Sequence, residues 1–562
     1  MGWLGTSRPT LWGAVIVALC APTLAQTSSD PSHIDERFRP QPAQPTLGAP
    51  IEVPAAPQRT APSGTQNMPF TLSSIGFEGN TVLPTSQLET MAKAYVGRSI
   101  TLADVYELAD KITVAYRTAG YILARAVVPA QTVKDSHLTI RIIEGNVDQV
   151  KVQGDANGTK SYLEAYGRRI SAAQPLTADV LERELLLASD LNGVSVRNIL
   201  TPSATKQGAA DLTLVVDRKP IDAFVSVDNR GSKYLGPYEV MAGLFFNDVF
   251  GTAGRLGVNA VVTPDVGPDL AYGAISYTQP IGTNGMRLFA TASYTQTRPG
   301  SVLRALDTKG RATNGDMSLS FPFVRTRDLN LVGSLGFSYH DVQSSDLTTS
   351  PLFSDHVRSV NANVFLNVLD DWGGFSTVSA DITQGLNIFG ATRSSSTVKS
   401  RVGASGDFTR ANFEATHEHP LIERFSAMVG LSAQTSFGTP LLASEQYSLG
   451  STTYDRAFDP SEVTGDSAVA GKAELRWNAI DSISIVSGVQ FYGFYEGGNV
   501  WQSKALPGMP ESQTLTSTGA GIRFNVADHF NADLGWAKPL NKVVSATDKR
   551  DSRFLFTVSA NY

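Results

Sequence analysis

Residues 519–526 read Gly-Ala-Gly-Ile-Arg-Phe-Asn-Val, a segment in which side chains of opposite polarity alternate. A period of two is typical of a β-strand with one apolar and one polar face. The last ten residues, 553–562 (Arg-Phe-Leu-Phe-Thr-Val-Ser-Ala-Asn-Tyr), repeat the pattern, and Phe554, Phe556 and Tyr562 share one face. The end of the chain is therefore predicted to consist of amphipathic strands.

The same alternation extends upstream to residue 221 and defines sixteen segments separated by turns that are alternately short and long. They begin near residues 222, 237, 253, 269, 285, 313, 328, 356, 373, 401, 424, 467, 482, 514, 529 and 553. Every segment has an apolar face, and no second layer follows that could cover it. A closed antiparallel barrel with lipid outside and a polar lumen satisfies all of them. Residues 221–562 thus predict a 16-stranded membrane β-barrel with both ends on the periplasmic side.

The beginning of the chain, residues 1–25, has the features of a secretory signal peptide. Arg8 precedes the short apolar stretch 11–19, and a small-residue cleavage site ends at Ala25. Cys20, the only cysteine, lies before that site, so the mature chain should contain neither disulfides nor thiolate metal sites. A lipid-modified Cys20 is the less favoured alternative, because a bulky leucine precedes it.

Residues 26–69 form a proline-rich linker, with nine prolines between Pro31 and Pro69. Such a stretch buries too little apolar surface to offset its ordering entropy, which favours a disordered linker. The alternative is a short helix from His33 to Arg39, a possible plug for the pore.

Residues 70–146 and 147–220 form an internal repeat in which each copy is predicted to fold as β-α-α-β-β. In the first copy a helix begins at Thr101, where Asp104 completes a capping-box pattern. The second copy echoes it at Thr177. Two small α+β domains therefore form an arm that precedes the barrel.

Sequence signatures of catalysis or cofactor binding are missing. Charged residues make up only 17% of the chain and the formal net charge is −6, which gives no nucleic-acid footprint. There is no HExxH, P-loop or GxSxG motif. His417-Glu418-His419 is the one histidine cluster, predicted at a periplasmic turn with no third ligand nearby. We expect no enzyme activity, no cofactor and no metal; a barrel-linked hydrolase, the enzyme alternative, lacks a nucleophile motif.

Several short motifs keep a recognisable order along the chain. They are Gly120-Tyr121, Ala126-Val-Val-Pro129, Leu138-Thr-Ile-Arg-Ile-Ile-Glu-Gly145, Leu191-Asn-Gly-Val194, Gly208-Ala-Ala-Asp-Leu-Thr-Leu214, Asp228-Asn-Arg-Gly-Ser232 and Gly236. In this order they resemble the two-partner secretion transporters (TpsB type, haemolysin secretion/activation proteins). These transporters belong to a superfamily of outer-membrane assembly and translocation barrels. The resemblance covers about residues 70–562 and implies that the two arm domains are POTRA domains.

A second group of motifs concerns the long loop predicted at residues 439–466. The family carries Val-Arg-Gly-Tyr/Phe on a loop that folds into the lumen, where the arginine meets an acid on a neighbouring strand. Here the stretch is Asp455-Arg456-Ala457-Phe458, which keeps the arginine and the aromatic residue and changes the other two. The acid of the family lies in a Phe-x-Asp motif, which reads Phe494-Tyr495-Glu496 in this chain.

The resemblance implies that this loop is locked inside the barrel by Arg456, Phe458, Asp466 and Glu496. The alternation along the strand points Glu496 into the lumen, where an arginine can hold a carboxylate through two hydrogen bonds. From the residues alone, a solvated loop arginine unrelated to Glu496 is an equally good interpretation. The terminal aromatics Phe554, Phe556 and Tyr562 are expected to act as the barrel's C-terminal signal.

The leading functional interpretation is a translocation pore in the outer membrane of a Gram-negative bacterium. Its POTRA domains, in the periplasm, would capture an unfolded exoprotein and the barrel would secrete it. The expected partners are a large secreted exoprotein, outer-membrane lipid and the barrel-assembly machinery, with no nucleic acid and a monomeric transporter. A barrel-assembly factor is the alternative, although such proteins usually carry more than two POTRA domains. A diffusion porin or receptor would not need the arm.

Overall fold

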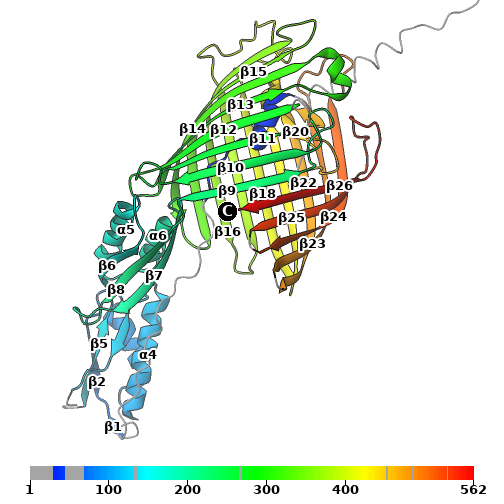
Figure 1. Ribbon diagram of the computed structural model, residues 1–562. Helices are drawn as coiled ribbons and strands as arrows, with labels where there is room; N and C mark the ends of the chain where they lie inside the picture. Colours follow the sequence, from blue (N-terminus) through cyan, green and yellow to red (C-terminus); the bar gives the residue numbers. More distant parts are fainter. Residues whose placement is uncertain are drawn as a thin grey trace, which may run out of the picture.

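The structure, a computed structural model, is a closed barrel with an arm that extends from one end (Figure 1). It describes residues 30–44, 69–131, 136–264, 269–450, 453–483, 485–527 and 529–562. The predicted signal peptide and most of the predicted linker lie outside the described residues. Among the helices of the described residues, none is long and apolar enough to cross a membrane.

The barrel consists of sixteen antiparallel strands, which confirms the predicted fold class. In chain order the strands are β9 (Ile221–Asp228), β10 (Glu239–Asn247), β11 (Arg255–Val262), β12 (Leu270–Ile281), β13 (Met286–Thr297), β14 (Lys309–Arg325), β15 (Leu329–Ser345), β16 (Phe353–Leu369), β17 (Phe375–Gly385), β18 (Thr409–Ile422), β19 (Phe425–Thr435), β22 (Ser467–Ile483), β23 (Val486–Trp501), β24 (Ser512–Val526), β25 (Phe530–Pro539) and β26 (Arg553–Asn561). The barrel closes where β26 pairs with β9, with Thr557 opposite Asp228. A short 3₁₀ helix, η1 (Ser301–Leu306), follows β13.

The two faces of each strand differ as the alternation predicts. On β22, Leu475 and Trp477 are 53% and 43% exposed on the outer surface, whereas Glu474, next to Leu475 in the sequence, is buried in the lumen. Trp477 stacks against Phe425 and Phe491 of the neighbouring strands, with ring centroids 6.0 and 5.5 Å away. Aromatic side chains of this kind suit a lipid-facing surface, so the outer wall matches a bilayer rather than a soluble core.

One predicted strand start is wrong by more than four residues: β18 begins at Thr409 and not at residue 401. The intervening residues form a loop instead of a strand. Ala404 and Phe408 of this loop are buried in an apolar cluster with Leu441 and Leu442. Contacts with another loop therefore outweigh the local alternation in this segment.

The arm contains two α+β domains. The second has the predicted β-α-α-β-β order, whereas in the first the predicted initial strand is divided in two and a short strand lies between the helices. The first arm domain consists of β1 (Phe70–Thr71), β2 (Ser74–Glu78), α3 (Thr85–Ala92), β3 (Ser99–Ile100), α4 (Leu102–Thr118), β4 (Arg125–Val127) and β5 (His137–Ile143). The second arm domain consists of β6 (Val147–Gly154), α5 (Lys160–Ala172), α6 (Ala178–Ser189), β7 (Val194–Pro202) and β8 (Ala210–Arg218). The main sheets have the orders β2-β5-β4 and β6-β8-β7, and the extra strand β3 pairs only with β1.

Local chemistry explains two features of the first arm domain. Thr101 and Asp104 form the predicted capping box at the start of α4, which satisfies free amides at the helix end. Gly145, which follows β5, has φ +77°, and a Cβ there would lie 2.6 Å from the Cβ of Leu123. Only glycine fits such a position, which explains why the motif Leu138–Gly145 ends in glycine.

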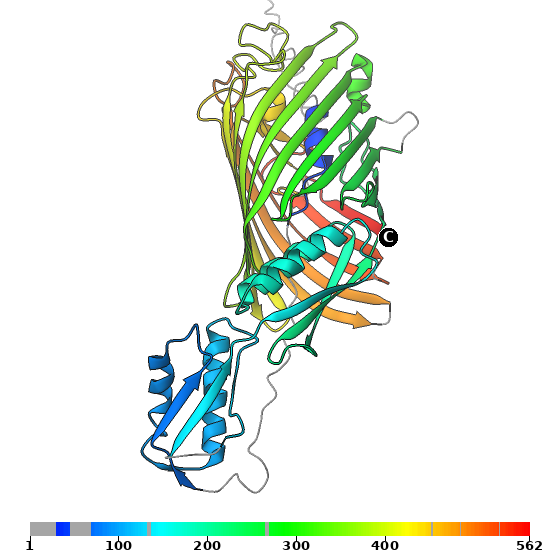
Figure 2. The same cartoon turned by 90° about the vertical axis from the view of Figure 1, so that its left-hand side faces the viewer.

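The second arm domain is fastened to the end of the barrel that faces the arm (Figure 2). Arg325, at the end of β14, donates two hydrogen bonds to Asp190, the residue that caps α6. Arg169 of α5 donates to the backbone oxygen of Thr283 in the β12–β13 turn, at 2.6 Å. These contacts place α5 and α6 beside the periplasmic turns of the barrel.

A short helix, α2 (Pro31–Phe38), lies inside the barrel, in the half away from the arm (Figures 1 and 2). Ile34 of this helix packs against Val261 and Leu270 of the barrel wall. Arg37 donates two hydrogen bonds to Glu239, at 3.1 and 2.8 Å. The favoured prediction of a disordered linker is therefore wrong for residues 30–44, because charged and apolar side chains of the segment find partners in the barrel.

Candidate functional site in the barrel lumen

The long loop between β19 and β22 folds back into the barrel. It contains the 3₁₀ helix η2 (Ala443–Glu445) and a small hairpin made of β20 (Tyr447–Leu449) and β21 (Val463–Gly465). Leu449, Phe458 and Val463 of the loop are buried in one apolar cluster with Phe494 and Leu515 of the barrel wall. The loop is thus held in the lumen by an apolar core that it shares with the barrel wall.

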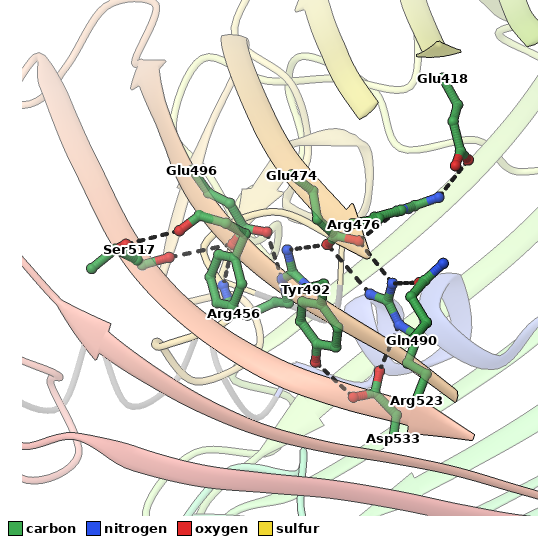
Figure 3. Close-up of polar contacts among 12 residues, drawn as sticks. Glu418, Arg456, Glu474, Arg476, Gln490, Tyr492, Glu496, Ser517, Arg523 and Asp533 are labelled. Carbon is green, nitrogen blue, oxygen red and sulfur yellow. Dashed lines mark hydrogen bonds and ion pairs between the residues drawn. The ribbon is translucent and has the colours of Figure 1, made fainter. Parts of the chain in front are cut away.

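Arg456 and Glu496 are brought together at the tip of this loop (Figure 3). The Nε of Arg456 lies 2.6 Å from Oε1 of Glu496, and the backbone N–H of Arg456 donates to Oε2 at 2.9 Å. Ser517 of β24 donates a further hydrogen bond, of 3.3 Å, to the same carboxylate. Glu496 is fully buried and Arg456 is 9% exposed, so both charges depend on this pairing.

Glu474 is a second carboxylate that sequence reasoning did not assign to the arginine. The Nη2 of Arg456 donates to Oε2 of Glu474 at 3.0 Å. Glu474 also accepts hydrogen bonds from Arg476, at 2.8 Å, and from Arg523, at 2.7 Å. Glu474 therefore links the loop tip to arginines on two barrel strands. Its inward position on β22 was the one available sequence signal.

Aromatic rings complete the environment of the guanidinium. The Cζ of Arg456 lies 3.7 Å from the ring centroid of Phe494 and 5.7 Å from that of Tyr492. A guanidinium over a ring face is attracted by the ring quadrupole, and the attraction grows when water is excluded. The arginine is fixed on one side by carboxylates and on the other by aromatic faces, which lysine would not reproduce.

The other two predicted lock residues have different places. Phe458 is buried in the apolar cluster of the loop, as a residue that anchors the tip should be. Asp466 pairs with Arg401 of the β17–β18 loop rather than with Arg456. It also accepts from the backbone N–H groups of Leu441 and Ser503, at 2.9 and 2.7 Å. Asp466 thus connects the β17–β18, β19–β22 and β23–β24 loops and is not part of the Arg456 contact.

The tip departs from the family pattern at Asp455, whose side chain is completely buried. Neither of its carboxylate oxygens has a hydrogen-bond partner within the described part of the chain. Its φ of +58° is a backbone conformation that aspartate tolerates better than most residues. The valine-to-aspartate change therefore leaves the Arg456 contact in place and adds a buried polar group beside it.

A polar network across the lumen joins the segment that contains α2 to the long loop. The Nη1 of Arg39, just after α2, lies 3.5 Å from Oδ2 of Asp316. The Oδ1 of Asp316 lies 3.0 Å from Nε2 of His340. On its other side, Nδ1 of His340 lies 3.9 Å from Oε1 of Glu445 in η2. The Oε2 of Glu445 lies 3.0 Å from Nη1 of Arg410 in β18. Beside this network is a cavity of about 410 Å³ lined mainly by serine, asparagine, aspartate and threonine side chains.

The terminal aromatic residues face outward from β26. Phe554 and Tyr562 are 77% and 74% exposed, and Phe556 is half-buried against Tyr238, 6.3 Å between ring centroids. Leu555, between them in sequence, points inward and is buried. The last strand thus has the lipid-facing aromatic surface that its alternation predicts.

The prediction for the histidine cluster needs correction. His417 and His419 lie on β18 itself, and a third group is near: Asp370, in the β16–β17 turn. One ligand atom from each of the three lies within 4.8 Å of the others. The turn and the strand are far apart in sequence, and their closeness follows from the pairing of Ser376 with His417.

Comparison with known proteins agrees with this architecture. The chain is 24% identical over 490 residues to the heme/hemopexin transporter protein HuxB of Haemophilus influenzae (strain 86-028NP), which covers 86% of this chain and 85% of HuxB. It is 25% identical over 514 residues to the outer membrane transporter CdiB of Escherichia coli, covering 87% and 83% of the two chains. The solved structure of CdiB from Escherichia coli matches with a TM-score of 0.70 at 20% identity, over 99% of this chain and 100% of that one.

The family models cover both parts of the chain. The POTRA domain of ShlB type matches residues 70–145, and the haemolysin secretion/activation protein ShlB/FhaC/HecB matches residues 208–524. The second match covers more than half of the chain and lies mainly on the barrel. The chain therefore belongs to the haemolysin secretion/activation family and is an outer-membrane transporter of the two-partner secretion type with periplasmic POTRA domains.

Proposed function

We propose that the arm captures an unfolded exoprotein and that the lumen conducts it after α2 and the long loop are displaced. The observation that carries this proposal is the composition of what fills the pore. Within the described residues the lumen is occupied by α2 and the long loop, which contact the wall through apolar clusters and polar side chains and form no part of the barrel sheet. Polar contacts can be exchanged for contacts with water or with a passing chain.

Capture of an extended chain is supported by the sheets of the arm. Within the described residues, each three-stranded sheet has two unpaired edges, which are β2 and β4 in the first arm domain and β6 and β7 in the second. An edge strand offers backbone N–H and C=O groups to an added strand, whatever its sequence. Recognition of this kind suits a partner that arrives unfolded.

Conduction requires a change in the lumen. α2 and the long loop lie in the lumen beside a cavity of about 410 Å³, so an exoprotein passes only after both segments move aside. The polar lining of this cavity favours a hydrated polypeptide over a lipid or an apolar ligand. Displacement of the loop requires the Arg456–Glu496 contact to break, which makes this contact the proposed lock. Removal of residues 445–462 should widen the pore.

The experiment that tests the proposal removes the first arm domain. A transporter lacking residues 70–145 is coexpressed with its cognate exoprotein, and secreted exoprotein is measured in the medium. We expect secretion to be lost while the barrel remains in the outer membrane in normal amount. The control removes residues 347–350, an exposed part of the β15–β16 loop, and should secrete normally. Normal secretion by the arm deletion would contradict capture by the arm.

The remaining partners are proposed from the surface of the barrel. The exposed apolar outer wall takes outer-membrane lipid, and the outward aromatics Phe554, Phe556 and Tyr562 provide the signal that the barrel-assembly machinery reads. We propose a monomer as the working unit, because one barrel encloses a complete lumen. A transporter of this family has no need of catalysis, and we propose no catalytic residues.

A further inference from the structure

The strongest unassigned feature is the group formed by Asp370, His417 and His419 at the periplasmic rim of the barrel. All three side chains are half-buried. The two histidines share the outer face of β18, because His417 lies opposite Val429, which is 52% exposed on the outer wall. The group is therefore outside the lumen and separate from the Arg456 site.

The three side chains converge on one small space, next to Gly374. A Cβ built on Gly374 would lie 2.5 Å from Oδ2 of Asp370, 2.8 Å from Cε1 of His417 and 3.0 Å from Nδ1 of His419. Any residue other than glycine would fill this space. Because Gly374 has no side chain, the carboxylate and the two imidazoles can lie close together beside it.

Hydrogen bonds already orient two of the three groups. Oδ1 of Asp370 accepts from the backbone N–H groups of Trp372 and Gly374, at 2.9 and 2.7 Å, so Oδ2 is the oxygen that faces the histidines. Nδ1 of His417 is 2.8 Å from the Oγ of Ser376, which leaves Nε2 as the ligand atom. Such outer partners, which fix the direction of a ligand, are typical of metal sites.

We propose that Asp370, His417 and His419 bind a divalent cation of the zinc class. Two imidazole nitrogens and one carboxylate oxygen are a donor set that Zn²⁺ accepts, with water in the remaining position. One ligand atom from each residue lies within 4.8 Å of the other two. Calcium and magnesium prefer oxygen ligands and are not expected to compete.

The site has a structural link to the loop lock. Glu418, between the two histidines, points to the opposite side of β18, where Oε2 accepts from Arg476 at 2.5 Å. Arg476 also binds Glu474, the second partner of Arg456. A cation bound to these two histidines would therefore restrain the segment of β18 that also carries Glu418. Through Glu418, this restraint would reach Arg476 and Glu474 in the lumen. Glu418 is itself no ligand, since it faces away from the cation.

The test measures Zn²⁺ and Co²⁺ binding to the full-length transporter in detergent, prepared without an oligohistidine tag. We expect one Zn²⁺ per chain after equilibrium dialysis, and a visible Co²⁺ absorption band that Zn²⁺ removes. His419→Ala and Asp370→Asn should each weaken binding at least tenfold. Glu418→Gln is the matched control, because it changes the same strand without removing a ligand, and should bind as the wild type does.

A second measurement separates metal binding from misfolding. Hydrogen exchange of residues 409–422 should slow when Zn²⁺ is added to the wild type and to Glu418→Gln, and should not change in His419→Ala. A variant that keeps the heat-modifiable mobility of a folded barrel on gels is taken as folded. Equal Zn²⁺ binding by the wild type and both ligand variants, or no binding by the wild type, would overturn the proposal.

Discussion

Arg325 of the barrel holds Asp190 of the second arm domain through two hydrogen bonds, 2.8 and 2.9 Å long. The arginine side chain is only 2% exposed and also donates to Asn330 at 2.7 Å. A bidentate pair between charged groups is among the stronger and more directional contacts in proteins. The orientation of the arm under the pore therefore depends on this one pair more than on the exposed contacts around it.

The first prediction concerns Asp190→Asn, which keeps the shape of the side chain and removes its charge. We expect the junction to weaken by about 2 kcal/mol, since hydrogen bonds to charged groups contribute that much. Distances between spin labels on the arm and the barrel should become broader. The control is Asp217→Asn, which alters a pair with Arg197 that is 3.8 Å long and more than 70% exposed on both sides. Unchanged distances in Asp190→Asn would mean that other contacts fix the arm.

The second prediction concerns the lock. Arg456→Ala and Glu496→Gln should each lower secretion and loosen the long loop without loss of barrel insertion. Removing one partner leaves the other charge buried, at a cost on the order of 3–5 kcal/mol that lumen water reduces. The double variant should be little worse than either single one, because both changes remove the same contact. Secretion and protease sensitivity of the loop are the measurements.

An exposed pair supplies the control for the lock. Arg424 and Asp481 lie 3.1 Å apart with side chains 50% and 78% exposed, and Arg424→Gln should not change secretion. Strictly additive losses in the double lock variant would show that Arg456 and Glu496 act independently.

The third prediction concerns the plug helix. Deletion of residues 31–44 should turn a small, intermittent conductance in planar bilayers into a larger and steadier one, because α2 no longer occupies the lumen. The variant lacking residues 347–350, outside the barrel, should conduct as the wild type does. A wide steady conductance from the intact transporter would contradict a plugged resting state.

The fourth prediction concerns the acid stability of the first arm domain. Partial burial raises the pKa of Glu144, but hydrogen bonds from Thr81, from the N–H of Val82 and from Tyr116 outweigh it and hold that pKa below the ordinary value of 4.5. A lowered folded-state pKa means that the stabilisation is fully present above 4.5 and is lost as the pH falls through the folded value. The protection of β5 amides against hydrogen exchange, relative to the intrinsic exchange rate at each pH, should therefore fall in this range of pH.

The variant Glu144→Gln should make the exchange of β5 faster at neutral pH and less sensitive to acid. Glu78→Gln is the control, because Glu78 is exposed and lies 3.5 Å from Arg141 in the same sheet. An acid response of Glu144→Gln equal to that of the wild type would show that another group is responsible.

The barrel could be predicted from the sequence because lipid on one side and water on the other require an alternation with a period of two. That period also placed Glu496 inside the lumen. It does not say which groups meet across the lumen, and so the role of Glu474 as second partner of Arg456 could not be predicted. Only the tilt and closure of the strands decide such distances.

The contacts between loops could not be predicted for a related reason. Arg401 and Asp466 are 65 positions apart and neither lies on a strand of the barrel. The helix α2 is short and rich in charge, and its burial depends on barrel residues such as Glu239. Sequence patterns describe each segment by itself, whereas these segments are ordered by what they touch.

Residues 39–69 connect the plug helix covalently to the first arm domain. Release of α2 from the lumen is consequently a unimolecular equilibrium, and the freed helix stays at an effective concentration on the order of millimolar near its site. Such a plug cannot be lost by dilution, and the same helix supplied as a separate peptide would compete with it poorly. Each passage of cargo can therefore be followed by resealing without recruitment of another molecule.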